Sequence, residues 1–365
     1  MVRPEPKKGI GNIKPHMLAE AALDSPPISI ALNSNESAFG PSLCAVEAAK
    51  AATTNLERYF ENPRDVLAPA IAETFGLDVE RITIGQGSDD LLARLARAYL
   101  EPGSELIRSV NGYLKIPNYA HANDAIPVAA PDDAFKASVD AILDCVTPKT
   151  RMVYLANPEN PAGSYLSGTK IRRLHAGLPE HILLVLDCAY EEYVDATDYE
   201  PGHKLVEEFE NVVMTRTFSK IYGLAGARMG WLYGSREIVD IVSRISLTFP
   251  VASPTIAATL AALEDKNHIQ FVRQENSRLR KAMTQSLINM GLKVYPSQTN
   301  FLLVEFPDST KSAADASIYL RQKGIAVRRF ASPAYKDCIR ITLGFESELC
   351  AVEQAITAFL KGEIL

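Results

Sequence analysis

The most informative stretch of this sequence runs Thr217-Phe218-Ser219-Lys220-Ile221-Tyr222-Gly223-Leu224-Ala225-Gly226-Ala227-Arg228-Met229-Gly230-Trp231. It follows a short apolar run, Val212-Val213-Met214, which is typical of a buried strand. Lys220 stands among glycines, alanines and apolar side chains, with a like charge at Arg228. Both surroundings favour the free amine of the lysine, which is its nucleophilic form.

The same stretch offers ligands for a phosphate. Ser219 can contribute a hydroxyl, and Arg228 can contribute a guanidinium fork. A nucleophilic lysine beside a phosphate site suits pyridoxal phosphate, whose aldehyde binds an amine and whose phosphate needs an anchor. Taken alone, these residues also fit an exposed lysine and a helical arginine, so the rest of the chain must distinguish the two interpretations.

Length and composition exclude several classes of protein. The 365 residues are 47% hydrophobic and 22% charged, as in a soluble globular protein of one large or two ordinary domains. A net charge of −6 gives no indication of a nucleic acid or an anionic membrane as a partner. No apolar run approaches the ~18 residues that span a membrane, and the first residues lack the apolar core of a signal peptide. We therefore expect a cytoplasmic protein.

The cysteines and histidines give no sign of a metal centre. The 5 cysteines are widely spaced without a CxxC pair, and the 6 histidines show no spacing typical of metal ligands. The sequence therefore predicts free thiols in a reducing compartment and no metal site.

Most of the chain alternates between strands and helices. Apolar runs near residues 82, 152, 182 and 212 predict strands, and helices are predicted over 89–100, 167–176 and 203–210. This order is typical of an α/β fold with a mostly parallel central sheet sandwiched by helices. The loops at the carboxyl edge of that sheet, where such folds bind ligands, carry Ser88, Tyr113, Asn160, Asp187, Tyr190 and Lys220.

Three of these loops have distinctive chemistry. Gly85-Gln86-Gly87-Ser88 joins a strand to a helix, which suits either a phosphate at the helix N-terminus or an ordinary turn with Ser88 as N-cap. Two Asn-Pro steps make Asn157–Gly163 stiff, and one of their peptide bonds is a candidate for the cis form. Asp187 ends the clearest strand in the chain, Ile182–Leu186.

The pattern of predicted helices and strands changes near residue 250. Helices are predicted over 254–263, 266–290, 312–323 and 346–360, and strands over 300–306, 325–330 and 338–345, as in a smaller α+β domain. We expect an N-terminal arm and part of the small domain in 1–40, a large domain in 41–250 and the small domain in 251–365. Arg328 and Arg340 on neighbouring strands could bind a carboxylate or phosphate, or could face solvent.

Together these residues resemble a known family, the pyridoxal-phosphate-dependent aminotransferases of fold type I (class I/II), in particular the branch similar to histidinol-phosphate aminotransferase. The resemblance extends from about Ile13 to Leu360. Its motifs follow one another in order: the loop before Gly40-Pro41, Tyr59, Gly87-Ser88-Asp89, Asn160-Pro161-Ala162-Gly163, Asp187 with Ala189-Tyr190, Thr217-x-Ser219-Lys220, Arg228 and Arg340-Ile341-Thr342.

The resemblance implies a role for each matched residue. Lys220 is the catalytic residue, which forms the internal aldimine with the cofactor and later moves the α-proton of the substrate. Asp187 pairs with the pyridinium nitrogen and keeps it protonated, so that the ring accepts electrons. The other implied cofactor contacts are Asn160 and Tyr190 to the ring oxygen, Tyr113 against the ring, Ser88, Asp89, Ser219 and Arg228 to the phosphate, and Tyr59 from the second subunit of a homodimer.

The implied substrate contacts differ more from the family pattern. Arg340 and Arg328 match arginines that bind the anionic group of the amino donor or keto acid. His16 stands where the family commonly has a tyrosine, and Asn35 begins a loop, Asn35–Gly40, that departs from the usual Asn-Glu-Asn-Pro-Tyr-Gly. The donor implied is histidinol phosphate, or an aromatic or other amino acid, with 2-oxoglutarate as the acceptor in a ping-pong reaction.

Two other functions use the same scaffold. A lyase or decarboxylase would hold the cofactor with the same residues, because the bond that stands perpendicular to the ring selects the reaction. A ligand-sensing protein without catalysis is a further alternative, although the chain carries no DNA-binding extension.

Overall fold

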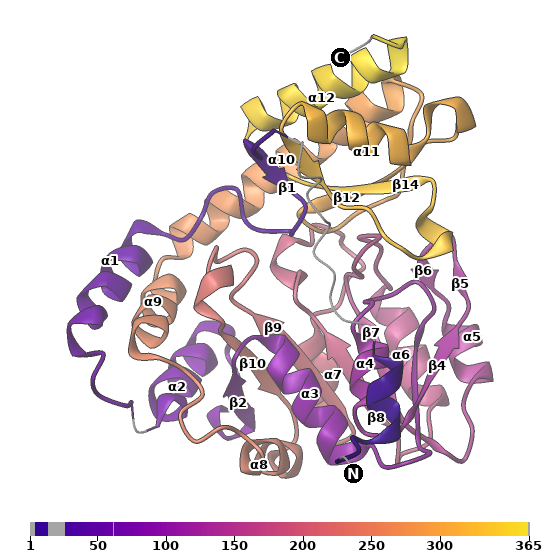
Figure 1. The fold of residues 1–365 in the computed structure, drawn as a ribbon. Helices are drawn as coiled ribbons and strands as arrows, with labels where there is room; N and C mark the ends of the chain where they lie inside the picture. The colour runs from indigo at the N-terminus through magenta and orange to yellow at the C-terminus, as the bar shows by residue number, and fades with distance from the viewer. Residues whose placement is uncertain (1–3, 14–25, 61, 364–365) are drawn as a thin grey trace.

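A computed structural model describes residues 4–13, 26–60 and 62–363 of the chain (Figure 1). Two bodies are visible, a larger one that contains a wide sheet and a smaller one that contains the C-terminal helices. The long helix α10 (Lys266–Asn289) runs between them.

The larger body is built on a seven-stranded sheet of order β2-β10-β9-β8-β7-β3-β4. All neighbouring pairs are parallel except those of β10, which is antiparallel to both β2 and β9. The predicted mostly parallel α/β sheet is therefore confirmed. Its strands are β2 (Ile82–Gly85), β3 (Glu105–Ser109), β4 (Ile126–Ala130), β7 (Thr150–Ala156), β8 (Leu183–Asp187), β9 (Val212–Thr217) and β10 (Gly230–Tyr233).

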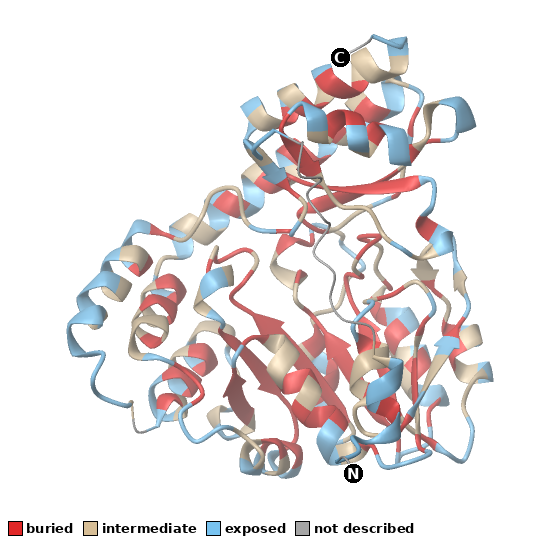
Figure 2. Ribbon diagram, viewed as in Figure 1, coloured by how far each residue is buried: buried red, intermediate tan, exposed pale blue. Residues whose placement is uncertain are grey.

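Helices cover both faces of this sheet because its strands are apolar on both sides. In β8, Leu184 and Leu186 pack with one apolar cluster, whereas Leu183 and Val185 pack with another. The first cluster includes residues of α2 (Pro63–Phe75), α6 (Gly168–Gly177), α7 (Gly202–Glu208) and α9 (Ser253–Glu264), and the second includes residues of α3 (Ser88–Tyr99), α4 (Ile116–His121) and α8 (Arg236–Arg244). Except for the edge strand β4, the strands are accordingly buried along most of their length (Figure 2).

The smaller body combines an antiparallel sheet with helices. The sheet has the order β11-β12-β14, formed by Lys293–Val294, Phe301–Glu305 and Cys338–Thr342. Its apolar face packs on α10, α11 (Ala313–Gln322) and α12 (Glu346–Lys361). From the beginning of the chain, β1 (Ile30–Leu32) joins this body by pairing in parallel with β13 (Ile325–Val327).

The packing of α9 bears on the domain boundaries. Its buried face, with Ile256 and Ala262, lies in the same apolar cluster as the larger sheet and contacts α2 and α1 (Leu43–Ala52). The division at residues 40 and 250 stays a prediction, and the packing of α9 argues for placing the second boundary after this helix.

Several local predictions can be compared with the structure. Ser42 caps α1 by accepting a hydrogen bond from Ala45 N, and Gly76 ends α2 with φ 69°. Gly87, not Ser88, occupies the N-cap position of α3. Both Asn-Pro bonds of the stiff loop are cis. The strand at 325–330 is shorter than predicted and ends at Val327, so Arg328 lies beyond it.

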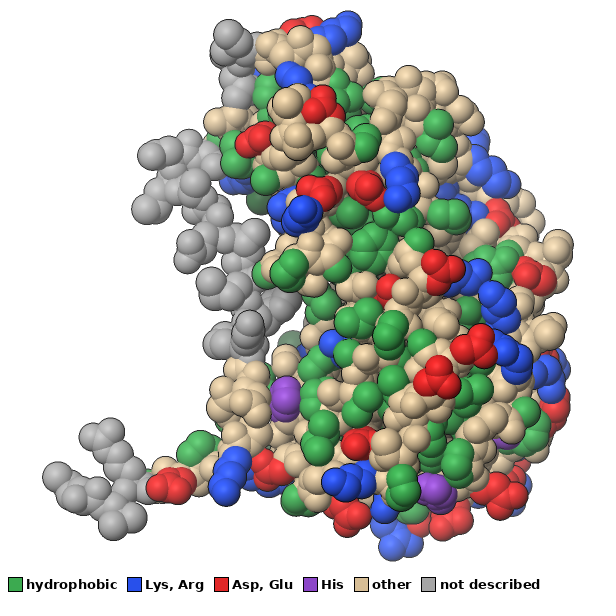
Figure 3. All heavy atoms as spheres, turned by 90° about the vertical axis from the view of Figure 1, so that its right-hand side faces the viewer, with side chains coloured by type: hydrophobic (Ala, Val, Ile, Leu, Met, Phe, Trp, Pro, Cys, Tyr) green, Lys and Arg blue, Asp and Glu red, His purple; other side chains and the backbone are tan. Residues whose placement is uncertain are grey.

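The surface shows no segregation of charge on the face seen in Figure 3, where acidic and basic side chains are interspersed among apolar ones. Within residues 4–13, 26–60 and 62–363, no helix is long and apolar enough to cross a membrane. The same part of the chain has no group of three or more acidic, cysteine or histidine side chains that could hold a metal ion.

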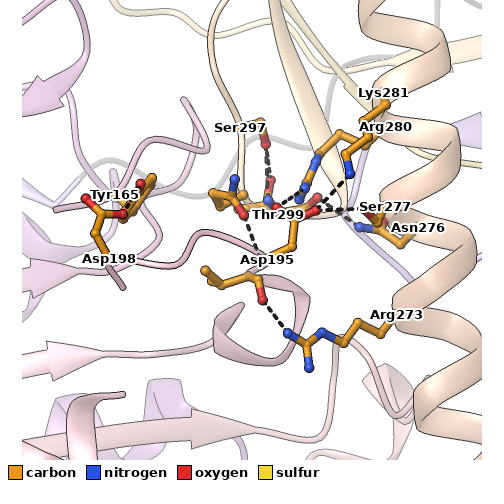
Figure 4. Close-up of polar contacts among 12 residues, drawn as sticks. Tyr165, Asp195, Asp198, Arg273, Asn276, Ser277, Arg280, Lys281, Ser297 and Thr299 are labelled. Carbon is orange, nitrogen blue, oxygen red and sulfur yellow. Dashed lines mark hydrogen bonds and ion pairs between the residues drawn. The ribbon is translucent and has the colours of Figure 1, made fainter. Parts of the chain in front are cut away.

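A polar cluster ties α10 to the larger body (Figure 4). Asp195, in the loop after β8, pairs with Arg280 at 2.8 Å and accepts a hydrogen bond from Ser277 Oγ at 2.7 Å. Arg273 donates to the carbonyl oxygen of Val194 at 2.7 Å. Arg280 is 5% exposed, so this contact fixes a buried charge between the two bodies.

Candidate active site

A cavity of about 270 Å³ lies at the carboxyl edge of the large sheet. The ends of β7, β8 and β9 contribute Ala156, Asp187 and Thr217 to its lining. Most of the predicted cofactor residues line it together: Ser88, Asp89, Tyr113, Asn160, Asp187, Tyr190, Ser219, Lys220 and Arg228. Lining residues as far apart in the sequence as Ser34 and Arg228 thus converge on one site.

Asp187 provides a buried carboxylate at the base of the cavity. Tyr154 donates its hydroxyl to Asp187 Oδ2 at 2.8 Å, and Thr215 donates to Oδ1 at 3.2 Å. Burial raises the pKa of Asp187 to about 6, with a further contribution from the charge of Asp89. No described lysine or arginine forms an ion pair with Asp187, so this carboxylate is suited to a basic ring nitrogen from a ligand.

Lys220 is half-buried in the wall of the cavity. Its Nζ donates to the backbone carbonyl of Asn35 at 3.3 Å and lies 5.7 Å from the centre of the Tyr190 ring. In the described part of the chain it forms no ion pair with an acidic side chain, so no carboxylate competes with a ligand for this side chain.

One end of the cavity is shaped for an anion. The backbone of Gly87 approaches Arg228 so closely that an added Cβ would lie 2.6 Å from Arg228 Nη2. Arg228 Nη1 donates to Ser219 Oγ at 3.3 Å, and the Ser219 hydroxyl also accepts from Thr217 Oγ1 at 2.9 Å. The N-terminus of α3 begins at Ser88 beside them. A guanidinium, hydroxyls and a helix N-terminus together form a phosphate cradle.

The side chain of Asp89 has other partners. It accepts hydrogen bonds from Tyr119 OH at 2.8 Å and Tyr113 OH at 3.2 Å, and it pairs with Lys115 at 3.0 Å. Burial opposes its ionisation, but Lys115 and the two hydroxyls hold its pKa below the usual value. Its carboxylate therefore orients Tyr113, and its backbone N–H is the group left for a phosphate.

Arg340 approaches the cavity from the smaller body. Its Nη1 donates to Asn160 Oδ1 at 2.6 Å and its Nη2 to the carbonyl of Asn33 at 2.9 Å. The side chain is not part of the cavity lining but contacts Asn160, which is. Burial lowers the pKa of Arg340 to about 10, and its Nε has no hydrogen-bond partner among the described residues.

The other predicted site residues lie around this centre. Asn35 is buried, donates from Nδ2 to Tyr190 OH at 2.9 Å and contacts Thr342, so it supports the wall of the site. Arg328 exchanges two backbone hydrogen bonds with Arg340, both of 2.9 Å. Tyr59 lies outside the cavity, 76% exposed and stacked on Phe249. His16 lies outside the described residues.

Some residues of the site were not singled out in the sequence. Tyr154 belongs to an apolar strand, and its alternation with core residues gave no sign that its hydroxyl reaches Asp187. Ser34 and Glu36 line the cavity on either side of Asn35. Glu159, buried between two cis prolines, binds the backbone of neighbouring loops. The one sign of Glu159 in the sequence is an acidic residue between two Asn-Pro steps.

The groups present fit pyridoxal phosphate. A lysine without an acidic partner, a buried carboxylate without a cation and a phosphate cradle correspond to the aldehyde, the ring nitrogen and the phosphate of that cofactor. Gly87 keeps the cradle open, since any side chain there would fill it.

Comparison with known proteins agrees with this fit. The model of the family "Aminotransferase class I and II" matches residues 27–358. The histidinol-phosphate aminotransferase of Nitrobacter winogradskyi is 43% identical over 99% of both chains, and that of Rhodospirillum centenum is 44% identical over 99% of this chain and 100% of its own.

Solved structures show the same fold. The histidinol-phosphate aminotransferase of Sinorhizobium meliloti, in complex with pyridoxal-5′-phosphate, superposes with a TM-score of 0.87 at 29% identity, covering 93% of this chain and 92% of its own. The aspartate aminotransferase of Thermus thermophilus with maleate has a TM-score of 0.79 at 21% identity, covering 91% and 92%. This chain therefore belongs to the class I and II aminotransferases, enzymes of fold type I that use pyridoxal 5′-phosphate.

Proposed function

We propose that this aminotransferase moves an amino group from histidinol phosphate, or from an aromatic or other amino acid, to 2-oxoglutarate in a ping-pong reaction. The observation that carries the proposal is Arg340, a buried guanidinium without a carboxylate partner in the described chain. A buried unpaired charge is costly, and an anionic substrate would offset that cost. The phosphate of histidinol phosphate and a carboxylate of 2-oxoglutarate can both supply the anion.

The residues divide the work around the cofactor. When bound, pyridoxal phosphate supplies an aldehyde that takes the amino group and a ring that withdraws electrons from the donor carbon. Lys220 would hold the aldehyde and, once the donor displaces it, take the proton from that carbon and return it. Asp187 would hold a proton on the ring nitrogen, helped by the Tyr154 hydroxyl.

The remaining contacts orient the ligand. Tyr113, Asn160 and Tyr190 would hold the ring, and Ser88, Asp89, Ser219 and Arg228 would hold the phosphate, with Asp89 using its backbone N–H. Arg340 would bind the substrate anion beside Asn160, with Arg328 as a second cation close by. His16 and Asn35 stay proposals for the substrate side of the site.

The activity test offers one amino donor at a time to the cofactor-loaded protein without an acceptor. Transfer predicts a stoichiometric keto product and loss of the absorbance of the bound aldehyde, followed by its return when 2-oxoglutarate is added. Parallel lines in double-reciprocal plots would support the ping-pong order. Release of carbon dioxide without a keto product would instead support the lyase alternative.

We also infer a homodimer whose partner covers the surface around Tyr59. Tyr59 is 76% exposed and stacks on Phe249 at 4.1 Å, while Leu56 and Leu247 nearby along the chain are also exposed. Exposed apolar side chains that lie together in a patch are typical of an interface. Leu247→Glu should convert the dimer to a monomer in sedimentation velocity, and a monomeric wild type would refute the inference.

We place the enzyme in the cytoplasm. The structure describes all 5 cysteines and leaves each of them free, including the buried Cys188 and Cys338. Free thiols persist in a reducing compartment. Fractionation of the native host that recovers the protein outside the cytoplasm would contradict this placement.

A further inference from the structure

Glu159 is an acidic residue with no role in the transfer of the amino group proposed above. It lies in the loop after β7, between Pro158 and Asn160, and is 4% exposed. It is not part of the cavity lining, although Pro158 and Asn160 on either side of it are. A carboxyl buried this deeply needs hydrogen-bond partners.

Its partners are the backbones of two cavity residues. Glu159 Oε1 accepts a hydrogen bond from Asn160 N at 3.0 Å and another from Tyr113 N at 3.2 Å. Tyr113 belongs to the loop after β3, and Asn160 belongs to the loop after the neighbouring strand β7. One carboxyl oxygen thus bridges two loops that both reach the cavity.

Gly112 makes room for this bridge. A Cβ added to Gly112 would lie 2.8 Å from Glu159 Oε2 and 3.2 Å from its Cδ. A larger residue would displace the carboxyl or the loop. The glycine before Tyr113 and the acid before Asn160 therefore form one arrangement.

The buried surroundings of Glu159 favour its neutral form near pH 7. Burial raises its pKa to about 8, and the nearby Asp187 adds to this effect. The two backbone N–H groups and the charge of Arg108 act in the opposite direction. Burial and, after it, the charge of Glu159 raise the pKa of the Tyr335 hydroxyl. Neutral or ionised, the carboxyl keeps the acceptor that both N–H groups need.

We propose that Glu159 is a positioning residue, which fixes Tyr113 and Asn160 relative to each other so that both can contact the cofactor ring at the same time. The inference rests on the proposed function, in which these two residues hold the ring. Without the bridge, two partly buried N–H groups lose their acceptor and the loops can separate.

The experiment compares two variants of nearly the same volume. Glu159→Gln keeps an acceptor at the same place, whereas Glu159→Leu keeps the bulk without an acceptor. Hydrogen exchange of the cofactor-free protein, followed by mass spectrometry, measures the peptides containing Tyr113 and Asn160. We expect exchange there to rise about tenfold in Glu159→Leu and to stay within about threefold of wild type in Glu159→Gln, since only the former leaves the donors unpaired.

The loaded enzyme gives a second readout. Glu159→Leu should bind pyridoxal phosphate about tenfold more weakly and lower kcat about tenfold, with little change in KM for the amino donor, whereas Glu159→Gln should rescue both. Gly112→Ala should reproduce the exchange effect if Glu159→Leu fails to fold. Gly11→Ala is the matched control, because its Cβ would meet nothing within 4 Å.

Equal exchange in wild type, Glu159→Leu and Gly112→Ala would overturn the inference. So would a loss in Glu159→Gln as large as that in Glu159→Leu, because the acceptor would then not be what matters. If wild type shows no amino transfer, the proposed function fails, while the exchange comparison on the cofactor-free protein still tests the bridge.

Discussion

Replacing Arg340 with methionine should strongly lower the activity of this enzyme toward 2-oxoglutarate without unfolding the protein. Arg340 is 6% exposed, and its guanidinium donates to two neutral acceptors, Asn160 Oδ1 and the carbonyl of Asn33. Methionine has a similar length and packs well in apolar surroundings. The substitution therefore separates the charge from the volume of the side chain.

The effect of Arg340→Met on stability can be worked out separately from its effect on catalysis. A pKa lowered from 12.5 to about 10 means that burying this charge costs the folded protein about 3 kcal/mol. Its two hydrogen bonds to neutral acceptors return a similar amount, at about 1.5 kcal/mol each. We therefore expect the free energy of unfolding of Arg340→Met to lie within about 1 kcal/mol of wild type.

The catalytic loss should be much larger. A bidentate contact between Arg340 and a substrate carboxylate makes two charge-assisted bonds, worth about 3–4 kcal/mol together. Each 1.4 kcal/mol is a factor of ten. The value of kcat/KM for 2-oxoglutarate should therefore fall by about 10²- to 10³-fold, in an assay that follows glutamate formation under subsaturating acceptor.

The neighbouring arginine supplies the control. Arg329 Nη1 donates to the carbonyl of Lys336 at 2.7 Å and takes no part in the cavity lining. Arg329→Met should leave kcat/KM within about twofold of wild type. Equal kcat/KM in wild type and Arg340→Met, or a loss fully explained by unfolding in urea, would refute the reasoning.

Three further predictions concern other parts of the molecule. Lys220→Ala should abolish transfer, and borohydride reduction of the loaded wild type should label Lys220 alone; a label on another lysine would contradict its role. Asp187→Asn should raise the free energy of unfolding of the cofactor-free protein by about 2–3 kcal/mol at pH 8. The reason is that the raised pKa of Asp187 makes the stability of the wild type fall as the pH rises from 3.8 to about 6. In urea titrations the difference between variant and wild type should vanish near pH 4, and a difference that does not depend on pH would refute the prediction. Although burial opposes ionisation of Asp195, Ser277 and Arg280 lower its pKa to about 2. The ionised carboxylate therefore contributes its full stabilisation of the fold above pH 4, and this contribution is lost as the pH falls toward 2. Asp195→Asn should therefore lower the free energy of unfolding at pH 7 by about 1–2 kcal/mol, since Arg280 loses its carboxylate. Urea denaturation measures this loss as a lower midpoint, with the conservative Asp195→Glu as the control. An unchanged midpoint in Asp195→Asn would contradict the prediction.

Much of the fold could be predicted because its strands carry strong local signals. The run Ile182–Leu186 is apolar on both faces, and the structure buries it between two layers of helices. β10 and β4 were not anticipated. β10 is a Gly-Trp-Leu-Tyr segment that directly follows the lysine loop, and β4 includes a proline and lies at the sheet edge, so neither has the pattern of a central strand.

The candidate site was predictable to the extent that its residues end strands. Asp187 and Lys220 follow apolar runs whose carboxyl ends share one edge of the sheet. The supporting contacts could not be predicted, since they depend on which strand lies next to which. Tyr154 reaches Asp187 because β7 and β8 are neighbours, and Glu159 reaches Tyr113 because β3 lies beside β7. Neither adjacency is encoded by residues close in the sequence.

The reversed strand β10 has a consequence for how the protein acquires its cofactor. It lies between β2 and β9, and its first residue, Gly230, packs against the backbone of Gly87 and Ser88. The two halves of the phosphate cradle thus come from segments about 130 residues apart and meet when this strand is inserted. Uptake of pyridoxal phosphate during refolding should therefore require that β10 is already paired with β2 and β9. The yellow colour of the bound cofactor can then serve as a direct measure of the formation of this sheet.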